Sequence, residues 1–449
     1  MRAILLAALL IATPAAAQPA EPPLLRDLPA KVSPDRLHAT IARLVAFGTR
    51  HTLSDTKSDK RGIGAARRWV AAEFAAIGKA CGGCLAVETP SQVVTAPPRT
   101  PNPTEIVDVL AIQRGTSDPN RVVIISAHLD SRVTDVMNAT ADAPGANDDA
   151  SGVAAVIEAA RVLSQHKFPA TIVYAALQGE EQGLHGGKVL ADYAAAQGWR
   201  VEADLNNDII GNTEGLSGVR DNTHVRVFSE GTRAIETPEE ANRRRYNGGE
   251  VDSPSRQLAR MMDVLADRYL TGFDVVMVYR TDRFGRGGDQ VRMLEAGYPS
   301  VRVTEAVENY TRQHQDLRVE NGVRYGDVIG GVDFTYLAQV TRLNSVAMAS
   351  LASAPPPPSD VKIAGAVSPN TTVSWAAAPG AAGYRVWWRG TTEPQWRFNR
   401  WAGDATSTVL KDVVIDDWFF GVSAVTQDGW ESPVVFPGAA GSFESVTAK

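Results

Sequence analysis

The sequence lacks a strong excess of charge, an internal repeat and any apolar run long enough to span a membrane. Its formal net charge is -6 and its pI is about 5.7. These values give no reason to expect nucleic acid or an anionic membrane as a partner. Hydrophobic residues make up 44% of the chain and charged residues 21%, which is typical of a soluble globular protein rather than a disordered or membrane-spanning one.

The N-terminus has the order of a secretory signal peptide. Arg2 precedes an apolar segment over residues 3–12, and three alanines, 15–17, stand directly before Gln18. The apolar segment is too short to cross a bilayer, and small residues of this kind form a cleavage site. We therefore expect residues 1–17 to be removed and the protein to be periplasmic or secreted. A buried N-terminal helix is the alternative.

Only two cysteines are present, Cys81 and Cys84, in the segment "ACGGC". Such a pair can be a redox site in a cytosolic protein, but here it lacks a strand-to-helix setting and lies in a chain expected to be exported. A small structural disulfide is the favoured interpretation, and redox catalysis remains the alternative.

The length of 449 residues favours two domains. A proline run, "ASAPPPPSD", lies at residues 352–360 and is expected to act as a semi-rigid spacer. We therefore divide the chain, after residues 1–17, into a body over 18–351, a linker over 352–359 and a C-terminal domain over 360–449.

Apolar runs and helical patterns alternate along the body. Four short runs without polar alternation are expected to be strands covered on both faces. Helices are expected at residues 61–78, in the alanine-rich segment after residue 149, and from residue 327 to the end of the body. This rhythm predicts a three-layer α/β/α sandwich around a mostly parallel mixed sheet, with the functional site at the carboxyl ends of the strands. The four expected strands are 107–112, 121–127, 171–177 and 300–305.

The segment after the prolines changes character. Short strand-like runs with turn signals about every ten residues predict a small all-β sandwich. Its aromatic and apolar pattern resembles a fibronectin type III module, carried by Trp375, Tyr384, Trp388, Phe420, Val422 and Ala424. Four tryptophans are expected in its core, or else on an exposed surface that contacts a cell surface or polymer. These are Trp387, Trp388, Trp401 and Trp430.

Histidines and carboxylates follow the ends of the expected strands. His128 and Asp130 follow the second strand, and Glu180 and Glu181 follow the third. Asp148 and Asp149 precede the alanine-rich helix, where an aspartate could also serve only as an N-cap. Asp208 and His314 lie farther along. In an open α/β sheet these positions converge on one crevice, and oxygen plus nitrogen ligands without thiolate suit zinc, with manganese or cobalt as alternatives.

Five motifs in this order resemble the secreted di-zinc aminopeptidases and their relatives. They are "SAHLDS", "PGANDDASGVA", "LQGEEQGLHGG", "NNDIIGN" and "RQHQD". The resemblance covers roughly residues 35 to 350 and implies two zinc ions per chain. It assigns His128, Asp148 and Asp208 to one zinc and Asp148, Glu181 and His314 to the other. Glu180 would be the general base, and Asp130 would hold His128 in place.

Two positions depart from the family pattern and affect the expected substrate contacts. Asp289 is retained, but Gln290 stands where the family often has histidine. A tyrosine often precedes the last histidine directly, whereas here Gln313 does, and Tyr310 lies three residues earlier. Asp289 and Tyr310 are accordingly kept as candidate substrate-binding residues. A polar insertion at residues 214–254 could shape the pocket mouth, although we expect a surface excursion.

The sequence as a whole predicts an exported zinc metallopeptidase that removes N-terminal residues from peptide substrates. A carboxypeptidase and a single-zinc glutaminyl cyclase are alternatives within the same family. A binding or receptor protein that retains the peptidase scaffold is the alternative of another class. Such a protein would be expected to have lost ligands or the base, and this chain retains all of them.

Overall fold

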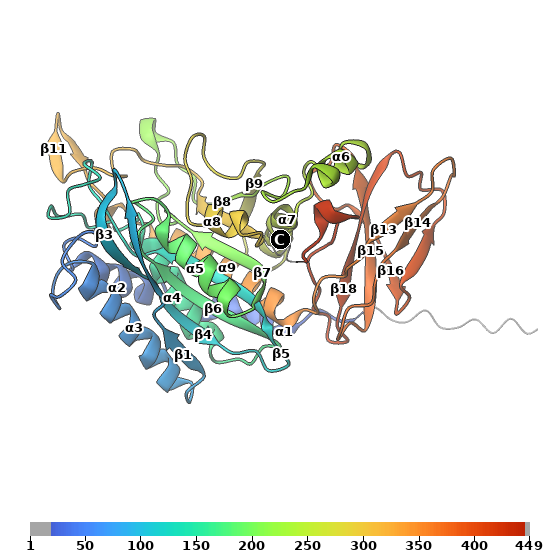
Figure 1. The fold of residues 1–449 in the computed structure, drawn as a ribbon, viewed down its shortest axis with the longest axis horizontal. Helices are drawn as coiled ribbons and strands as arrows, with labels where there is room; N and C mark the ends of the chain where they lie inside the picture. Colours follow the sequence, from blue (N-terminus) through green and yellow to red (C-terminus); the bar gives the residue numbers. More distant parts are fainter. Residues whose placement is uncertain (1–18, 445–449) are drawn as a thin grey trace, which may run out of the picture.

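The computed structural model describes residues 19–444, which fold into a large α/β unit and a smaller all-β unit that lies beside it (Figure 1). The expected signal peptide, residues 1–17, lies outside the described residues. Among the helices of residues 19–444, none has the length and apolar character needed to cross a bilayer.

An eight-stranded mixed sheet forms the centre of the large unit. Its four middle strands, β6, β5, β7 and β10, are parallel to one another; antiparallel pairs join β1, β4 and β6 at one side and β10 and β8 at the other, and the edge strand β9 is parallel to β8. The all-apolar strand β6 is buried along its whole length, as expected of a strand covered on both faces. The strand order is β1 (Leu85–Glu88), β4 (Val109–Gln113), β6 (Ala170–Leu177), β5 (Asp118–His128), β7 (Arg200–Asn207), β10 (Ser300–Glu305), β8 (His224–Phe228) and β9 (Asp274–Val278).

Helices cover both faces of this sheet, and alternate side chains of one strand are buried in two separate apolar cores. In β5, Val123 and Ile125 point into the first core, while Val122 and Ile124 point into the second, because successive side chains of a strand point to opposite faces. The predicted three-layer α/β/α sandwich is therefore confirmed. The first face is covered by α2 (Pro34–Val45), α3 (Ile63–Ala80), α4 (Ala150–Leu163), α7 (Pro254–Tyr269) and α9 (Phe334–Ser353), and the second by α5 (His185–Ala196) and α8 (Gln290–Glu295).

Two element boundaries differ from the sequence prediction. The last helix, α9, begins at Phe334 and not at residue 327, because the Asp333 side chain caps it by accepting from the N–H groups of Thr335 and Tyr336. The run expected as one strand at 107–112 is divided at Asp108. Before Asp108, β3 (Thr100–Val107) pairs with β2 (Ser91–Ala96) in a separate hairpin. After Asp108, β4 forms part of the eight-stranded sheet.

The insertion at residues 214–254 is part of the fold, so the expected surface excursion was wrong. It supplies β8, which pairs with β10 and β9 and buries Val225 and Val227. It also supplies α6 (Pro238–Asn247), which lies next to the all-β unit (Figure 1). The remaining elements are α1 (Pro23–Asp27), a hairpin of β11 (Arg318–Glu320) and β12 (Val323–Tyr325), and 3-10 turns at Leu28–Lys31, Leu216–Gly218, Ile329–Gly331 and Ala439–Gly441.

The C-terminal unit consists of two three-stranded antiparallel sheets that share one apolar core. Val373 of one sheet and Val386, Phe420 and Val422 of the other are buried in it. Trp387, Trp388, Trp401 and Trp430 are each half-buried. The first sheet is β13 (Lys362–Ala364), β14 (Thr371–Ser374) and β17 (Ser407–Leu410), and the second is β16 (Phe398–Gly403), β15 (Gly383–Gly390) and β18 (Trp418–Val425).

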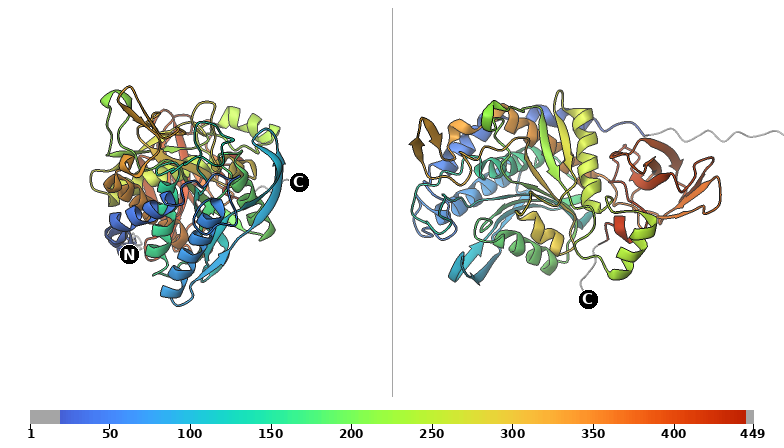
Figure 2. Two further views of the ribbon diagram at one scale, coloured as in Figure 1. Left: turned by 90° about the vertical axis from the view of Figure 1, so that its left-hand side faces the viewer. Right: turned by 90° about the horizontal axis from the view of Figure 1, so that it is seen from above.

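The two units pack directly against each other, and the right-hand view of Figure 2 shows them side by side. Asp252 of the large unit is fully buried and accepts hydrogen bonds from Arg260 at 2.7 Å and from Arg389 of the C-terminal unit at 2.8 Å. The Tyr279 hydroxyl donates to the carbonyl of Pro394 at 3.2 Å. Ala354 and Pro355, at the start of the proline run, are buried. The proline segment is therefore packed against the large unit and does not hold the units apart.

Candidate metal centre

The candidate ligands gather at the carboxyl edge of the sheet. His128 is the last residue of β5, Glu181 follows β6 and Asp208 follows β7 directly. His314 lies in the loop after β10, and Asp148 precedes α4. Because parallel strands end at the same edge, five ligand positions separated by up to 186 residues in the chain (314 minus 128) meet in one place.

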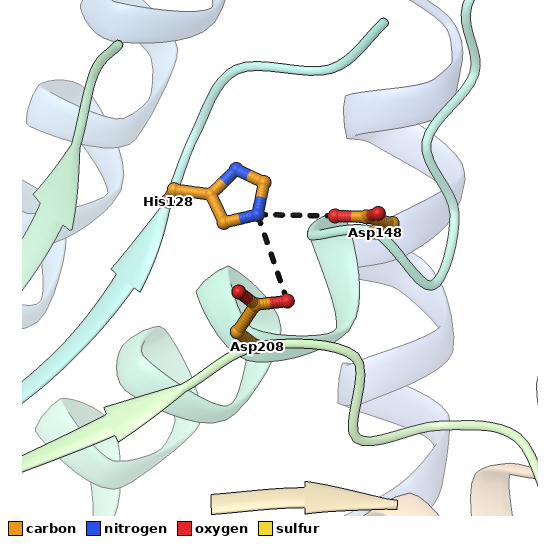
Figure 3. A group of neighbouring side chains, drawn as sticks. All are labelled: His128, Asp148 and Asp208. Atoms are coloured by element: carbon orange, nitrogen blue, oxygen red, sulfur yellow. Dashed lines mark ion pairs between the residues drawn. The ribbon is translucent and has the colours of Figure 1, made fainter. Parts of the chain in front are cut away.

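Three of these side chains form a first group, shown in Figure 3. The Nε2 atom of His128 lies 3.0 Å from Oδ1 of Asp148 and 3.8 Å from Oδ1 of Asp208. All three side chains are buried. Their ligand atoms lie within 4.8 Å of one another, so one cation could contact all of them.

Asp148, Glu181 and His314 form a second group. The Nε2 atom of His314 lies 3.0 Å from Oδ2 of Asp148 and 3.0 Å from Oε1 of Glu181. Asp148 therefore directs one carboxylate oxygen to each histidine. This is the arrangement that a carboxylate shared by two cations requires.

The electrostatics of these groups fit a cation. Burial opposes charge on His314, but the carboxylates of Glu181 and Asp148 outweigh it and raise its pKa to about 10. The same competition, with Asp130, Asp148 and Asp208 as partners, raises the pKa of His128 well above its ordinary value. Oε1 of Glu181 is buried and makes no hydrogen bond of ordinary geometry within residues 19–444, although Nε2 of His314 lies 3.0 Å from it. A divalent cation would satisfy this oxygen and replace the protons that the histidines otherwise need, and the nitrogen and oxygen donors suit zinc.

Asp149 explains how Asp148 is presented. Its carboxylate caps α4 by accepting from the N–H of Gly152 at 2.9 Å. It also accepts from the N–H groups of His128 at 3.1 Å and Ile209 at 3.2 Å. The N-cap interpretation thus applies to Asp149, whereas the adjacent Asp148 points into the metal groups. One side chain joins the helix to the ends of two strands that carry candidate ligands.

Asp130 supports the glutamate pair. Its Oδ1 accepts from the N–H of Gly179 at 2.9 Å and of Glu180 at 3.3 Å, and its Oδ2 accepts from the N–H of Glu181 at 3.2 Å. The Nδ1 atom of His128 lies closer to the Asp130 carbonyl, at 3.1 Å, than to its carboxylate, at 3.6 Å. Asp130 therefore holds the histidine mainly through its backbone and the glutamate turn through its side chain.

Glu180 lines a cavity of about 580 Å³ beside the two groups. Burial raises its pKa well above the ordinary range, and the nearby carboxylates of Glu181, Asp208 and Asp289 add to this rise against the effect of His128. A carboxylate in this position can accept a proton and later return it.

The two candidate substrate residues are placed differently. Tyr310 lines the cavity and is 57% exposed. Asp289 is buried and accepts from the N–H of Gly187 at 2.9 Å, and burial raises its pKa to about 7. Asp289 is not among the residues that line the cavity. Gln290, which follows it, donates to Asp282 at 2.6 Å.

Away from the site, Cys81 and Cys84 are joined by a disulfide after α3.

Comparisons with known proteins agree with this geometry. A model of peptidase family M28 matches residues 108–316. A "Probable zinc metalloprotease" from Pyrenophora teres f. teres is 44% identical over 421 residues, which cover 92% of this chain and 86% of the relative. The chain belongs to peptidase family M28. It is a zinc metallopeptidase. A second relative, a "Probable zinc metalloprotease" from Leptosphaeria maculans, is 44% identical over 91% of this chain and 95% of its own length.

Solved structures show the same fold at low sequence identity. The LapA aminopeptidase of Legionella pneumophila superposes with a TM-score of 0.53 at 18% identity, covering 79% of this chain and 80% of LapA. LapB of the same organism gives a TM-score of 0.52 at 16% identity, covering 72% and 74%.

Three residues of the M28 site were missed by the sequence analysis. Asp327 accepts from the N–H groups of Asn147 at 2.9 Å and Asp148 at 2.7 Å. Arg302 lies 2.6 Å from Oδ2 of Asp208. Arg132 donates to Oε2 of Glu181 at 2.8 Å and lies 2.6 Å from Nδ1 of His314. Arg132 directly follows "SAHLDS" and could have been noticed there, whereas no sequence pattern marks the other two.

Proposed function

We propose that this M28 peptidase is an exported di-zinc aminopeptidase that removes N-terminal residues from peptides. The observation that carries the proposal is the position of Asp148, whose two oxygens each lie 3.0 Å from a different histidine. His128 and Asp208 would complete one zinc site, and Glu181 and His314 the other.

Zinc bound there supplies Lewis-acid polarisation of the scissile carbonyl and lowers the pKa of a water molecule. Glu180 is the proposed general base, because it lines the cavity beside the two candidate metal groups and belongs to neither of them. Its carboxylate takes one proton from the attacking water and later gives that proton to the nitrogen of the leaving amine. Asp130 keeps Glu180 in place by accepting from its backbone N–H.

Aminopeptidase activity is favoured over the alternatives by two features. The LapA aminopeptidase of Legionella pneumophila shares the fold. The complete set of five candidate ligands and the base favours an enzyme over a non-catalytic receptor, and favours two zinc ions over the single ion of a cyclase.

Export and the role of the C-terminal unit complete the proposal. Residues 1–17 would be a signal peptide, which places the mature enzyme, from residue 18, in the periplasm or outside the cell. Residues 360–449 would be a fibronectin type III-like module, because two antiparallel sheets enclose an apolar core around Val373 and Phe420. Its half-buried tryptophans would offer contact to a cell surface or polymer.

The test combines zinc analysis with two matched variants. Wild-type protein should contain close to two zinc ions per chain and should release N-terminal residues from unblocked peptides but not from N-blocked ones. Glu180→Gln should retain zinc and lose ~10²–10⁴-fold in kcat, while Glu181→Gln should lose zinc from one site. One zinc per chain in active wild-type protein, or undiminished turnover by Glu180→Gln, would contradict the mechanism.

A further inference from the structure

Outside the proposed metal ligands and base, the charged side chains on the wall of the cavity are arginines. Among the described residues that line it, the carboxylates are those of Asp148, Glu181 and Asp208, the proposed ligands, and Glu180, the proposed base. Apart from these four and His314, every charged side chain on that wall is an arginine. The four arginines are Arg99, Arg132, Arg283 and Arg286.

Nearby carboxylates do not neutralise these arginines fully. Glu308 is the shared partner of three guanidinium groups, at 2.7 Å from Arg226, 3.2 Å from Arg286 and 3.7 Å from Arg283. One negative charge thus faces three positive ones. Asp282, at 3.2 Å from Arg283, is itself shared with Arg302 at 3.5 Å. Cations bound by the ligand carboxylates would increase the positive excess further.

Arg99 reaches the same cavity from the β2–β3 hairpin. Arg99 donates to the backbone carbonyl of Glu181 at 2.9 Å, and no carboxylate within residues 19–444 forms an ion pair with it. Arg132, by contrast, is held by Glu181 and His314. Arg99 and Arg286 are exposed and are the guanidinium groups that remain available to a ligand in the cavity. The Arg283 side chain is only 10% exposed, pairs with Asp282 at 3.2 Å and lies 4.0 Å from Asp208, so it adds positive charge behind them.

We propose that Arg99 and Arg286, with Arg283 behind them, form a subsite that binds a carboxylate of the peptide substrate beside the metal centre. This inference rests on the proposed peptidase function and adds its substrate class. Arginine pairs strongly with carboxylates because its planar fork matches their geometry, and the pairing strengthens where water is partly excluded. The carboxylate can belong to an acidic side chain at the N-terminal residue or to the free C-terminus of a short peptide.

Four peptides separate the two sources. Glu-Ala-Phe-amide and Gln-Ala-Phe-amide differ only in a side-chain carboxylate, and Gln-Ala-Phe with a free C-terminus differs from its amide only in the terminal one. Glu-Ala-Phe with a free C-terminus carries both. The zinc-loaded full-length protein is assayed for kcat/KM, and the released amino acid is identified by chromatography. At least one carboxylate should raise kcat/KM by about tenfold at low salt, and the gain should shrink as sodium chloride is added.

Variants assign the effect to the proposed subsite. Arg99→Gln and Arg286→Gln should each reduce the preference for the carboxylate peptide by roughly fivefold. The preference is the ratio of kcat/KM for the carboxylate peptide to that for its neutral counterpart, so a general effect of the substitution on turnover cancels. Arg245→Gln is the matched control, because Arg245 is an exposed arginine of α6, outside the cavity. It removes the same charge and should leave the preference unchanged.

Equilibrium binding separates failure of this inference from failure of the proposed function. The same four peptides are titrated onto zinc-loaded Glu180→Gln protein. If wild-type protein hydrolyses none of the four peptides, the proposed function fails. In that case the subsite is still supported if carboxylate peptides bind more tightly than neutral ones and this difference depends on Arg99 and Arg286. Equal kcat/KM and equal affinity for charged and neutral peptides, or a preference that both arginine variants retain, would overturn it.

Discussion

The Oδ2 atom of Asp130 accepts a hydrogen bond from the backbone N–H of Glu181 at 3.2 Å. Asp130 lies two residues after the candidate ligand His128 and holds the turn that carries the candidate ligand Glu181. Asp130→Ala would leave this N–H, the N–H of Gly179 and the hydroxyl of Thr52 without their acceptor. We expect zinc affinity to fall roughly 10- to 100-fold, measured by competition with a chromogenic chelator. Asp130→Asn keeps one acceptor oxygen and should lose less. Wild-type affinity in the alanine variant would show that the turn is held by other contacts.

Asp327 should be needed for the position of Asp148. Its carboxylate is the acceptor for the N–H groups of Asn147 and Asp148, and Asp327→Ala would leave both donors buried and unpaired. We expect a loss of about 1–3 kcal/mol in the free energy of unfolding, measured by urea denaturation, together with a lower zinc content. Asp333→Ala is a suitable comparison, because it removes a helix cap that does not contact the metal groups. If only stability falls and zinc content is unchanged, Asp327 supports the fold but not the ligand.

The buried ion triad between the units should be essential for stability. Asp252→Ala leaves Arg260 and Arg389 without their shared carboxylate in a buried interface. Loss of one member of such a group typically costs about 3–5 kcal/mol, which denaturant unfolding would detect. A chain that ends at Ala352 would expose the same interface and should also be less stable than the full chain. An isolated large unit with full stability would mean that the contact contributes little.

Glu230 should make stability depend on pH. Burial raises its pKa from 4.5 to about 8, against a weaker opposing effect of Arg233. Between these two values the folded protein keeps a proton that the unfolded chain has released, so the free energy of unfolding falls as pH rises through this window. Glu230→Gln should remove part of this slope and stabilise the protein at pH 8 by roughly 1–4 kcal/mol. Glu250→Gln, an exposed glutamate of the same insertion, should leave the slope as it is. Parallel slopes in wild type and Glu230→Gln would contradict the assignment.

The sequence predicted those parts of the molecule that depend on local patterns. The uniform apolar character of β6 and the acidic residues directly after it indicated a central strand that ends at the site. The same reasoning brought together five ligand positions that the structure places in two groups. In each case neighbouring residues in the chain carried enough information, because strand burial and strand ends are local properties.

Features that depend on contacts between distant segments were not predicted. Asp327 lies 180 residues from Asn147 and belongs to no recognisable pattern. Strand β8 lies inside a polar insertion and is only five residues long, so its burial depends on β10 and β9. Asp252, Arg260 and Arg389 look like surface residues in the sequence, because their burial is created only when the two units meet.

The contact between Tyr279 and Pro394 affects how far the two units can be exchanged. Tyr279 begins the segment that leads from β9 to Arg283 and Arg286, and its hydroxyl is held by the C-terminal unit. Within the large unit, the guanidinium of Arg256 lies 3.6 Å from the centre of the Tyr279 ring and holds it in place. A chimera that replaces residues 360–444 with an unrelated domain would release one end of this segment. Replacing the C-terminal unit at the proline run would therefore also affect the segment that carries two arginines of the cavity wall, Arg283 and Arg286.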